Sequence, residues 1–421
     1  MAKSIFSNMS ALYELYLKHP KISTDTRRIA PGSLFFALRG ASFDGNRFAA
    51  EALEKGAAVA VVDDPSVALD DRYFVVEDSL QALQALAHEH RTALGIPILA
   101  VAGSNGKTTT KELVSRVLAQ KFCIYATQGN LNNHIGVPLT LLAMDERVEM
   151  GIVEMGASAC GEIAALCAIA DPDFGILTNV GRAHLEGFGG EEGVRRGKGE
   201  LYDYLAKNEG VAFIREEDET LRVMAEEREN LRVEGYSEEE AEGIAHQLEG
   251  NYNRYNVAAA AAIGRYFCVE EEAIRQAIID YHPDNNRSQR EERTTNTLIV
   301  DCYNANPSSM QVSMEHFMTE PLNGRSRKVM LLGDMRELGR WSEEEHRRII
   351  RLAHRDKTIE VKFVGEEFGK ALSSIDEELT AEHYADCDAL LKALEEQPLC
   401  DALILIKASR GIGLERVLTL L

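Results

Sequence analysis

A short glycine-containing loop, residues 102–110 with the sequence A-G-S-N-G-K-T-T-T, restricts the possible fold most strongly. It follows the apolar run 96–102 and precedes an amphipathic segment whose apolar face carries positions 113, 114, 117 and 118. Strand, glycine turn and helix in this order let backbone N–H groups and the positive end of the helix approach phosphate oxygens. Lys107 can neutralise the β- and γ-phosphates of a nucleotide, and the Thr108 hydroxyl can bind Mg²⁺. We therefore predict a nucleotide phosphate site at this loop.

The loop is a shortened variant of the common phosphate-binding pattern. It reads G-x-x-G-K-T, and Val101 occupies the position of the first glycine in G-x-x-x-x-G-K-[ST]. The alternative interpretation is a glycine turn that happens to precede a lysine. The order of strand, turn and helix favours the phosphate loop, and its predicted nucleotide-binding residues are Gly103, Ser104, Asn105, Gly106, Lys107, Thr108 and Thr109.

Two further polar residues follow apolar runs at the ends of predicted strands. Glu154 ends the run 151–154 and precedes a glycine, so it can supply the acid that a nucleotide-bound metal needs. His184 lies six residues beyond the run 175–178, at the same predicted edge of the sheet. Either residue could instead be a buried structural group, and a lone histidine is as often structural as functional.

Size, charge and cysteine content exclude several classes of protein. The chain has 421 residues, enough for about three domains of roughly 150 residues. Its net charge of −22 opposes binding to a nucleic-acid backbone over a large surface. The seven cysteines are scattered without zinc spacing, which is typical of reduced thiols. No apolar stretch approaches the roughly 18 residues that span a bilayer, so we expect a cytoplasmic protein without membrane insertion.

The alternation of apolar runs with amphipathic stretches indicates an α/β protein with three segments, residues 1–93, 94–285 and 286–421. The acidic stretch 215–243 is interpreted as a solvated helix and loop, and residues 253–267 as an alanine-rich helix. A helix is also expected at 48–55. The expected strands are 33–38, 57–62, 96–102, 151–154, 175–178, 297–300, 329–332, 361–364 and 402–406.

The loop at 103–108, together with residues 153–156, 179–184 and 198–200, resembles the Mur ligases, the ATP-dependent amide-forming enzymes of peptidoglycan precursor synthesis. Three longer stretches are similar to the branch of the family that adds D-alanyl-D-alanine to UDP-N-acetylmuramoyl-tripeptide. They are G-N-L-N-N-H-I-G-V-P at 129–138, D-C-Y-N-A-N-P at 301–307 and G-D-M-R-E-L-G at 333–339. The resemblance therefore spans all three segments.

The resemblance implies a three-domain architecture, with an N-terminal domain for the UDP-sugar, a central P-loop domain with a parallel sheet for ATP, and a Rossmann-like C-terminal domain for the incoming D-alanyl-D-alanine. It also implies the roles of individual residues, and we expect a monomer. Adenine would contact Asn253 and Asn256, and Arg287 and Asp301 would close over the phosphates and ribose. The implied substrate-binding residues are Thr26, Arg27, Asn46, Asn132, Asn133, Asn304, Asn306, Lys407, Ser409 and Arg410. Ordinary turns, surface residues and helix N-caps are the structural alternatives, the last for the two adenine-site asparagines.

The same resemblance implies that Lys107, Glu154, His184 and Lys198 are catalytic. Thr108 and Glu154 would bind the first Mg²⁺, while His184 and Lys198 would serve a second. An ammonium group beside Mg²⁺ would be repelled. In the family this lysine is carbamylated by CO₂, which converts the cation into an anion. Without the resemblance, R-R-G-K at 195–198 would be interpreted as a basic patch for phosphate.

The chain also departs from the family pattern. The insert between the acidic stretch and the alanine-rich helix is short, Asn251-Tyr252-Asn253 differs from the usual helix start, and Cys302 replaces a common serine. The alternatives are another ligase of the superfamily, such as the enzyme that adds the third peptide residue or a folate polyglutamate ligase, a regulatory P-loop protein, or a descendant that only binds nucleotide. Residues 304–307 and 333–335 argue against the other ligases.

Overall fold

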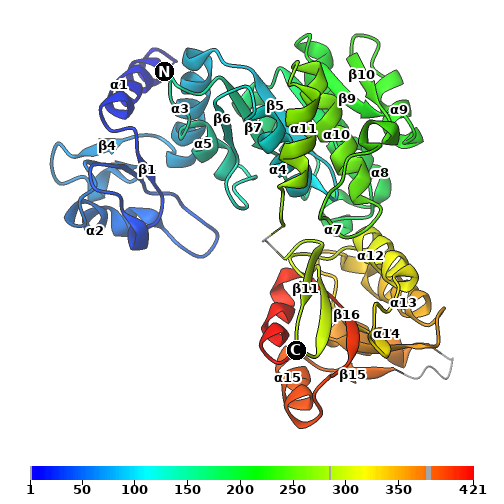
Figure 1. The fold of residues 1–421 in the computed structure, drawn as a ribbon. Coiled ribbons are helices and arrows are strands. Elements are labelled where there is room, and N and C mark those ends of the chain that lie inside the picture. Colours follow the sequence, from blue (N-terminus) through cyan, green and yellow to red (C-terminus); the bar gives the residue numbers. More distant parts are fainter. Residues whose placement is uncertain (1, 284–285, 376–380) are drawn as a thin grey trace.

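Three β-sheets with flanking helices make up the protein (Figure 1), and a computed structural model describes residues 2–283, 286–375 and 381–421. Two of the sheets are entirely parallel and the third has one antiparallel strand. This confirms the predicted α/β class. The expected domain boundary at 93–94 falls within the last turn of the helix Ser79–Leu94. Residue 285 of the second boundary lies outside the described residues, and both boundaries stay predictions.

The N-terminal sheet is small and has the strand order β1-β2-β3-β4. Helix α2, Ala49–Glu54, packs on it through Ala49, Ala52 and Leu53 against Phe35 of β2. The predicted strands at 33–38 and 57–62 and the helix at 48–55 are all present with slightly shorter bounds. The four strands are Ile22–Ser23, Leu34–Phe36, Val59–Val62 and Tyr73–Val75.

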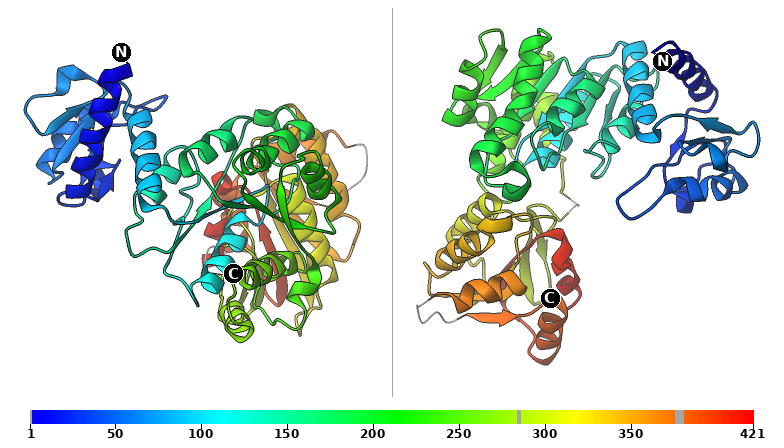
Figure 2. Two further views of the ribbon diagram at one scale, coloured as in Figure 1. Left: turned by 90° about the horizontal axis from the view of Figure 1, so that it is seen from above. Right: turned by 180° about the vertical axis from the view of Figure 1, so that it is seen from behind.

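Helices α1, Ala2–Lys18, and α3, Ser79–Leu94, connect this sheet to the central domain. The Tyr16 hydroxyl donates to the Leu142 carbonyl at 2.7 Å, and His90 Nε2 lies 2.9 Å from the Met144 carbonyl. Arg91 donates to the Ala170 carbonyl at 3.0 Å. Helix α3 packs on the central domain as well as on α1 and β2, and Figures 1 and 2 show it beside the central domain.

The central sheet has six parallel strands in the order β10-β9-β8-β5-β7-β6. Alternate residues of β5 point to opposite faces, with Leu99 and Val101 packed toward α4 and α10, and Ile98 toward the other core. The expected apolar face of α4, positions 113, 114, 117 and 118, is fully buried. The strands are Ile98–Ala102, Ile124–Ala126, Met150–Glu154, Phe174–Leu177, Val211–Arg215 and Arg232–Tyr236 for β5 to β10.

Helices cover both faces of the central sheet and place the phosphate loop and Lys198 at its carboxyl edge. The alanine-rich helix expected at 253–267 is α10. Helix α4 begins at Lys107, within the phosphate loop sequence. The helices are α4 Lys107–Leu118, α5 Gly136–Leu141, α6 Glu162–Ala170, α7 Leu185–Phe188, α8 Glu191–Lys207, α9 Glu219–Glu226, α10 Asn253–Tyr266 and α11 Glu271–Ile279.

The interpretation of the acidic stretch as helix and loop was wrong in part. Residues 232–236 form β10, which pairs in parallel with β9 at the sheet edge. Four of its five residues are exposed, so the strand lacks the apolar run that identifies a buried parallel strand. Helix α9 supplies the expected helical part.

The C-terminal sheet has the order β11-β12-β16-β13-β14-β15, and only β11 is antiparallel to its neighbour. All four predicted strands of this segment are present. The strands are Gln289–Glu292, Asn296–Val300, Arg327–Gly333, Ile359–Val364, Glu382–Tyr384 and Ala402–Lys407 for β11 to β16. The helices are α12 Pro307–Thr319, α13 Ser342–Ala353, α14 Glu366–Ser373 and α15 Cys387–Glu396.

The seven cysteines carry free thiols. Among the described helices, none combines the length and the apolar character that crossing a bilayer requires.

Candidate functional site

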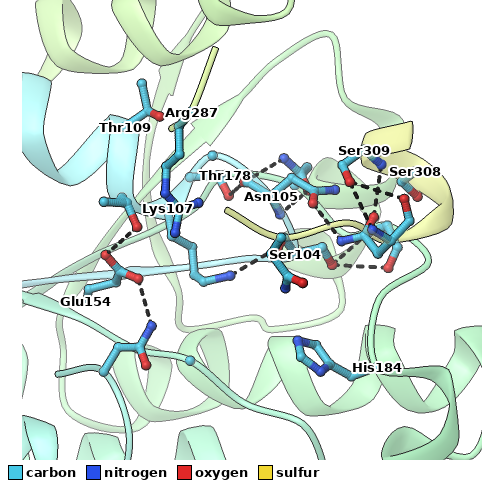
Figure 3. Close-up of a pocket in the computed structure, with 18 of the residues that line it drawn as sticks. Ser104, Asn105, Lys107, Thr109, Glu154, Thr178, His184, Arg287, Ser308 and Ser309 are labelled. Atoms are coloured by element: carbon cyan, nitrogen blue, oxygen red, sulfur yellow. Dashed lines mark hydrogen bonds between the residues drawn. The ribbon is translucent and has the colours of Figure 1, made fainter. Parts of the chain in front are cut away.

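A cavity of about 870 Å³ lies where the carboxyl edge of the central sheet faces the C-terminal domain. Most of the predicted site residues line it. They are Ser104, Asn105, Gly106, Lys107, Thr108, Thr109, Asn132, Asn133, Glu154, His184, Asn253, Asn256, Arg287, Asp301, Asn304, Asn306 and Lys407. Figure 3 shows the phosphate loop with Glu154 on one side and the start of α12 on the other.

The phosphate loop needs both of its glycines. Gly103 has φ +134°, and a Cβ there would lie 2.1 Å from Thr178 Oγ1. Gly106 has φ +79° and immediately precedes α4, and a Cβ there would lie 2.9 Å from Asn256 Oδ1. Left-handed backbone and close packing together leave room only for glycine at these two positions. Gly103 itself does not line the cavity, so its role is to shape the loop.

The end of β8 fixes the shape of the loop. The Thr178 hydroxyl donates to the Asn105 carbonyl at 2.5 Å, and Asn179 Nδ2 donates to the same oxygen at 2.9 Å. The Asn105 N–H donates to Asn179 Oδ1 at 3.1 Å, and the Ser104 hydroxyl donates to the Gly181 carbonyl at 3.1 Å. These contacts hold the loop backbone in place before any nucleotide binds.

The Lys107 side chain lies across the loop and is held by carbonyl groups of the loop backbone. Its ammonium group donates to the Gly103 carbonyl at 2.8 Å and to the Ser104 carbonyl at 3.0 Å. Burial lowers the pKa of Lys107 to about 8, while the Glu154 carboxylate opposes this shift. A phosphate group in the cavity would favour the charged ammonium form.

Glu154 ends β7 and is 2% exposed. Its carboxylate accepts hydrogen bonds from the Thr108 hydroxyl at 3.0 Å and from Asn132 Nδ2 at 2.8 Å. A carboxylate and a hydroxyl are hard oxygen donors of the kind that Mg²⁺ prefers. Asn133 lines the same side of the cavity, but its Oδ1 accepts from the backbone N–H groups of Ile135 and Gly136.

His184 reaches the cavity from the end of the loop after β8 and meets the C-terminal domain there. Its Nδ1 lies 2.6 Å from Glu337 Oε2, and this contact lowers the pKa of the Glu337 carboxyl. Both residues have left-handed backbone, with φ +52° at His184 and +63° at Glu337. Backbone strain of this kind concentrates at functional sites, where the surrounding structure enforces it.

Lys198 lies behind the wall of the cavity. Its side chain is fully buried on α8, and the ammonium group donates to the Ala157 carbonyl at 3.1 Å. Ala157 lines the cavity and Lys198 does not. Burial, with a smaller contribution from Lys107, lowers the pKa of Lys198 to about 7.

The predicted adenine-site asparagines are buried at the start of α10. The N-cap alternative for them was wrong, because Tyr252 is the N-cap and has no capping side chain. Asn253 Nδ2 instead donates to the Glu249 carbonyl at 2.6 Å, and Asn256 Nδ2 donates to Asn253 Oδ1 at 2.7 Å. The two side chains thus hold one another in a fixed orientation at the cavity wall.

The C-terminal domain contributes charged groups to the cavity. The Arg287 guanidinium lies 3.8 Å from the centroid of the Tyr303 ring. Lys407, 1% exposed, donates to Asp301 Oδ2 at 2.5 Å. In Figure 3 Arg287 lies next to Lys107, so cations from two domains converge on one place.

Several predicted substrate-binding residues lie outside the cavity. Thr26, Arg27 and Asn46 belong to the N-terminal domain, where Arg27 is exposed and pairs with Asp25 at 2.7 Å. The Asn46 side chain bonds to Asp44, Asp63 and Asp64 within its own domain. Buried Ser409 donates to the Ala305 carbonyl, and exposed Arg410 lies 3.5 Å from the Tyr303 hydroxyl.

Sequence reasoning missed several cavity residues. Glu337 and Ser308 lie in or next to motifs whose importance was clear, but their position against the central domain depends on the tertiary fold. Arg215 and Tyr255, which stack with 4.1 Å between guanidinium carbon and ring centroid, carry no local signal.

A phosphate loop, an acid at the neighbouring strand end and a second α/β domain that lines the same cavity together define an ATP-using enzyme with a site shared by two domains. Comparison with known proteins specifies it further. The Mur ligase family, catalytic domain matches residues 20–91, the Mur ligase middle domain matches 101–244, and the Mur ligase, glutamate ligase domain matches 286–410.

Similar proteins cover nearly the whole chain. The UDP-N-acetylmuramoyl-tripeptide–D-alanyl-D-alanine ligase of Bacillus subtilis is 32% identical over 99% of this chain and 98% of its own length. The Escherichia coli protein of that name is 31% identical over 94% and 92%. MurF of Acinetobacter baumannii (TM-score 0.83, 95% and 92% covered) and MurF of Thermotoga maritima in complex with ADP (TM-score 0.81, 95% and 96% covered) are each 27% identical. The chain belongs to the Mur ligase family.

Proposed function

We propose that this enzyme joins D-alanyl-D-alanine to UDP-N-acetylmuramoyl-tripeptide, converting ATP to ADP and phosphate and giving the UDP-MurNAc-pentapeptide precursor of peptidoglycan. The observation that carries the proposal is one cavity that brings the phosphate loop and Glu154 together with Arg287, Asn304 and Lys407 of the C-terminal domain. The names of the full-length relatives support the choice of substrates.

Amide formation requires an activated carboxyl group. A carboxylate oxygen of the tripeptide attacks the γ-phosphorus of ATP, the bond to ADP breaks, and an acyl phosphate forms. The amine of D-alanyl-D-alanine then attacks the carbonyl carbon, loses a proton, and phosphate leaves. Lys107 and the backbone N–H groups of the loop hold and neutralise the phosphates, so the enzyme acts mainly through positioning and electrostatics.

The residues around Glu154 fit Mg²⁺. The first ion would be held by Thr108 and Glu154, and His184 and Lys198 would serve a second. Bound Mg²⁺ supplies positive charge that stabilises the transferring phosphoryl group. The role of the protein is to present these oxygen donors in a buried position, where Asn132 orients the carboxylate.

We further propose that Lys198 is carbamylated. Only the neutral amine reacts with CO₂, and burial lowers the lysine pKa to about 7, so a substantial fraction is neutral near physiological pH. The carbamate would be an anion that no longer repels the metal ion.

The remaining assignments rest on family membership. The N-terminal domain, residues 1–93, would hold the UDP-sugar through Thr26, Arg27 and Asn46. Residues 94–285 would bind ATP, with Asn253 and Asn256 at adenine, and residues 286–421 would bind the dipeptide, with Asn304, Lys407, Ser409 and Arg410 as its candidate contacts. We propose that the enzyme acts in the cytoplasm as a monomer.

The proposal is tested by phosphate release from ATP in the presence of UDP-N-acetylmuramoyl-tripeptide. Release should depend on added D-alanyl-D-alanine, and the product should have the mass of the pentapeptide. Release that is equally fast without the dipeptide would favour a nucleotide-hydrolysing regulator. Turnover only with a different acceptor amino acid would indicate another ligase of the superfamily.

A further inference from the structure

Helix α12 of the C-terminal domain begins directly against the phosphate loop of the central domain. Asn306 is its N-cap, and Asn306 Oδ1 accepts a hydrogen bond from the Ser309 N–H at 2.9 Å. The other end of the same amide, Nδ2, donates to Asn105 Oδ1 at 2.7 Å. Asn306 is 8% exposed, and both bonds are partly buried at the wall of the cavity. The amide nitrogen and oxygen therefore each make one bond within the protein, while one N–H and one lone pair remain for other contacts.

A second contact lies two residues further along, at Ser308. The Ser308 hydroxyl accepts from the Arg182 N–H at 2.7 Å, and Gly181, the preceding residue, bonds to Ser104 of the loop. A Cβ at Gly181 would lie 2.8 Å from Ser308 Oγ and 3.1 Å from Ser308 Cβ. The start of α12 thus packs closely on the loop and on the chain that supports it. Figure 3 shows Ser308 and Ser309 beside Asn105.

The backbone of Asn105 is fixed within the central domain, whereas its side chain meets the other domain. Thr178 and Asn179 hold the backbone carbonyl, as described above, and Asn306 holds the side-chain oxygen. A hydrogen bond between two neutral amides is a modest net interaction. The position of α12 therefore acts on the Asn105 side chain, while the central domain holds the loop backbone.

We propose that the start of α12 is a positioning element, in which the Asn306–Asn105 pair fixes the Asn105 side chain of the phosphate loop against the docked C-terminal domain. Asn306 acts on the loop through Asn105. This inference rests on the proposed ligase function for its consequence. With the pair intact, the acyl phosphate is shielded until the amine attacks. With the pair broken, water can attack the carbonyl carbon, which returns the tripeptide carboxylate and free phosphate.

Asn306→Ser is the decisive variant, because serine also caps helices but is too short to replace the amide donor. It should leave the melting temperature close to that of the wild type. It should lower kcat about ten- to a hundred-fold, since small misplacements of reacting groups have effects of this size. The amount of amide formed per ADP should also fall clearly below one.

Asp386→Ser is the matched control. Asp386 caps α15 in the same domain, accepts from the Ala389 N–H at 2.8 Å, and does not line the cavity. It should retain wild-type kcat and one amide per ADP. Gly181→Ala should instead reproduce the loss of coupling, because its methyl group displaces Ser308.

The test measures ADP, amide product and ADP affinity for the wild type, N306S, N105S and the double variant. ADP affinity, measured by calorimetry, does not depend on the ligase reaction. The proposal predicts weaker ADP binding in each single variant and no further loss in the double variant. The proposal is overturned if N306S matches the wild type both in ADP affinity and in amide formed per ADP. It is also overturned if the losses of ADP affinity in the two single variants multiply in the double variant. A wild type without dipeptide-dependent turnover would refute the proposed function, while the ADP-affinity comparison would still decide the role of Asn306.

Discussion

At the scale of single residues, we expect phosphoryl transfer to depend strongly on the buried carboxylate of Glu154. It accepts bonds from the neutral Thr108 hydroxyl and Asn132 amide, so its negative charge remains available for a cation. Replacing it with glutamine keeps the size and removes the charge. Because metal charge stabilisation is worth several kcal/mol, we expect Glu154→Gln to lower kcat by about two orders of magnitude or more. Glu146→Gln, an exposed change in the same domain, should have no effect in the same phosphate-release assay.

Lys198 offers a chemical test at the same scale. We expect Lys198→Ala to abolish most activity because the carbamate cannot form, and a short carboxylic acid in the buffer should restore part of it. Lys207→Ala, an exposed position on the same helix, is the control and should behave like the wild type. Undiminished activity of Lys198→Ala, or restoration by chloride as effective as by the carboxylic acid, would contradict the role of the carbamate.

Tyr202, one turn beyond Lys198, has a buried hydroxyl group that affects stability. Its hydroxyl is buried and makes no hydrogen bond within the described residues, and burial raises the pKa of Tyr202. An unsatisfied buried hydroxyl costs about 1–3 kcal/mol. We therefore expect Tyr202→Phe to raise the melting temperature slightly or leave it unchanged, as measured by calorimetry. A clear decrease would show that the hydroxyl has a bonded partner, such as buried water.

At the scale of elements, helices α1 and α3 connect the N-terminal sheet to the central domain through a buried histidine. Burial lowers the pKa of His90, which contacts the Tyr16 hydroxyl and the Met144 carbonyl. The unfolded chain, with a pKa near 6.5, binds this proton more readily than the folded protein. Stability from His90 is thus present above about pH 6.5 and lost as the pH falls toward the folded pKa.

We expect His90→Gln to reduce the loss of stability between pH 7 and pH 5. One proton accounts for at most about 1.4 kcal/mol per pH unit, so the difference in slope should lie below that limit. Chemical denaturation at several pH values measures it. His346, also buried with a lowered pKa, should still contribute its own slope in the variant. Parallel curves for wild type and variant would rule out His90 as a contributor.

Most strands and helices with strong local patterns were predicted from sequence, although the buried strand β9 was missed despite its apolar run. The strand, loop and α4 unit follows from the glycines at 103 and 106 and from an apolar helical face. The edge strand β10 was missed because its exposed residues Arg232 and Glu234 show no apolar pattern. Its position is determined by pairing with β9, a contact with no local signal.

At the scale of the whole molecule, residues of the central and C-terminal domains form the site together. Sequence motifs identified the loop, Glu154, His184 and the stretch around Asn306. They could not show that Glu337 would lie 2.6 Å from His184, because that distance depends on how the third domain docks. Nor could they place Lys198 behind Ala157 or show that both ends of the Asn306 amide are used within the protein.

We propose that phosphoryl transfer within this two-domain cavity activates the carboxyl group of the tripeptide. The most direct measurement uses UDP-N-acetylmuramoyl-tripeptide labelled with ¹⁸O in its terminal carboxylate, together with ATP and D-alanyl-D-alanine. We predict that each phosphate released carries one ¹⁸O atom from the carboxylate while the pentapeptide forms in equal amount. Phosphate without ¹⁸O during pentapeptide synthesis would contradict the acyl phosphate and, with it, the assigned role of the site.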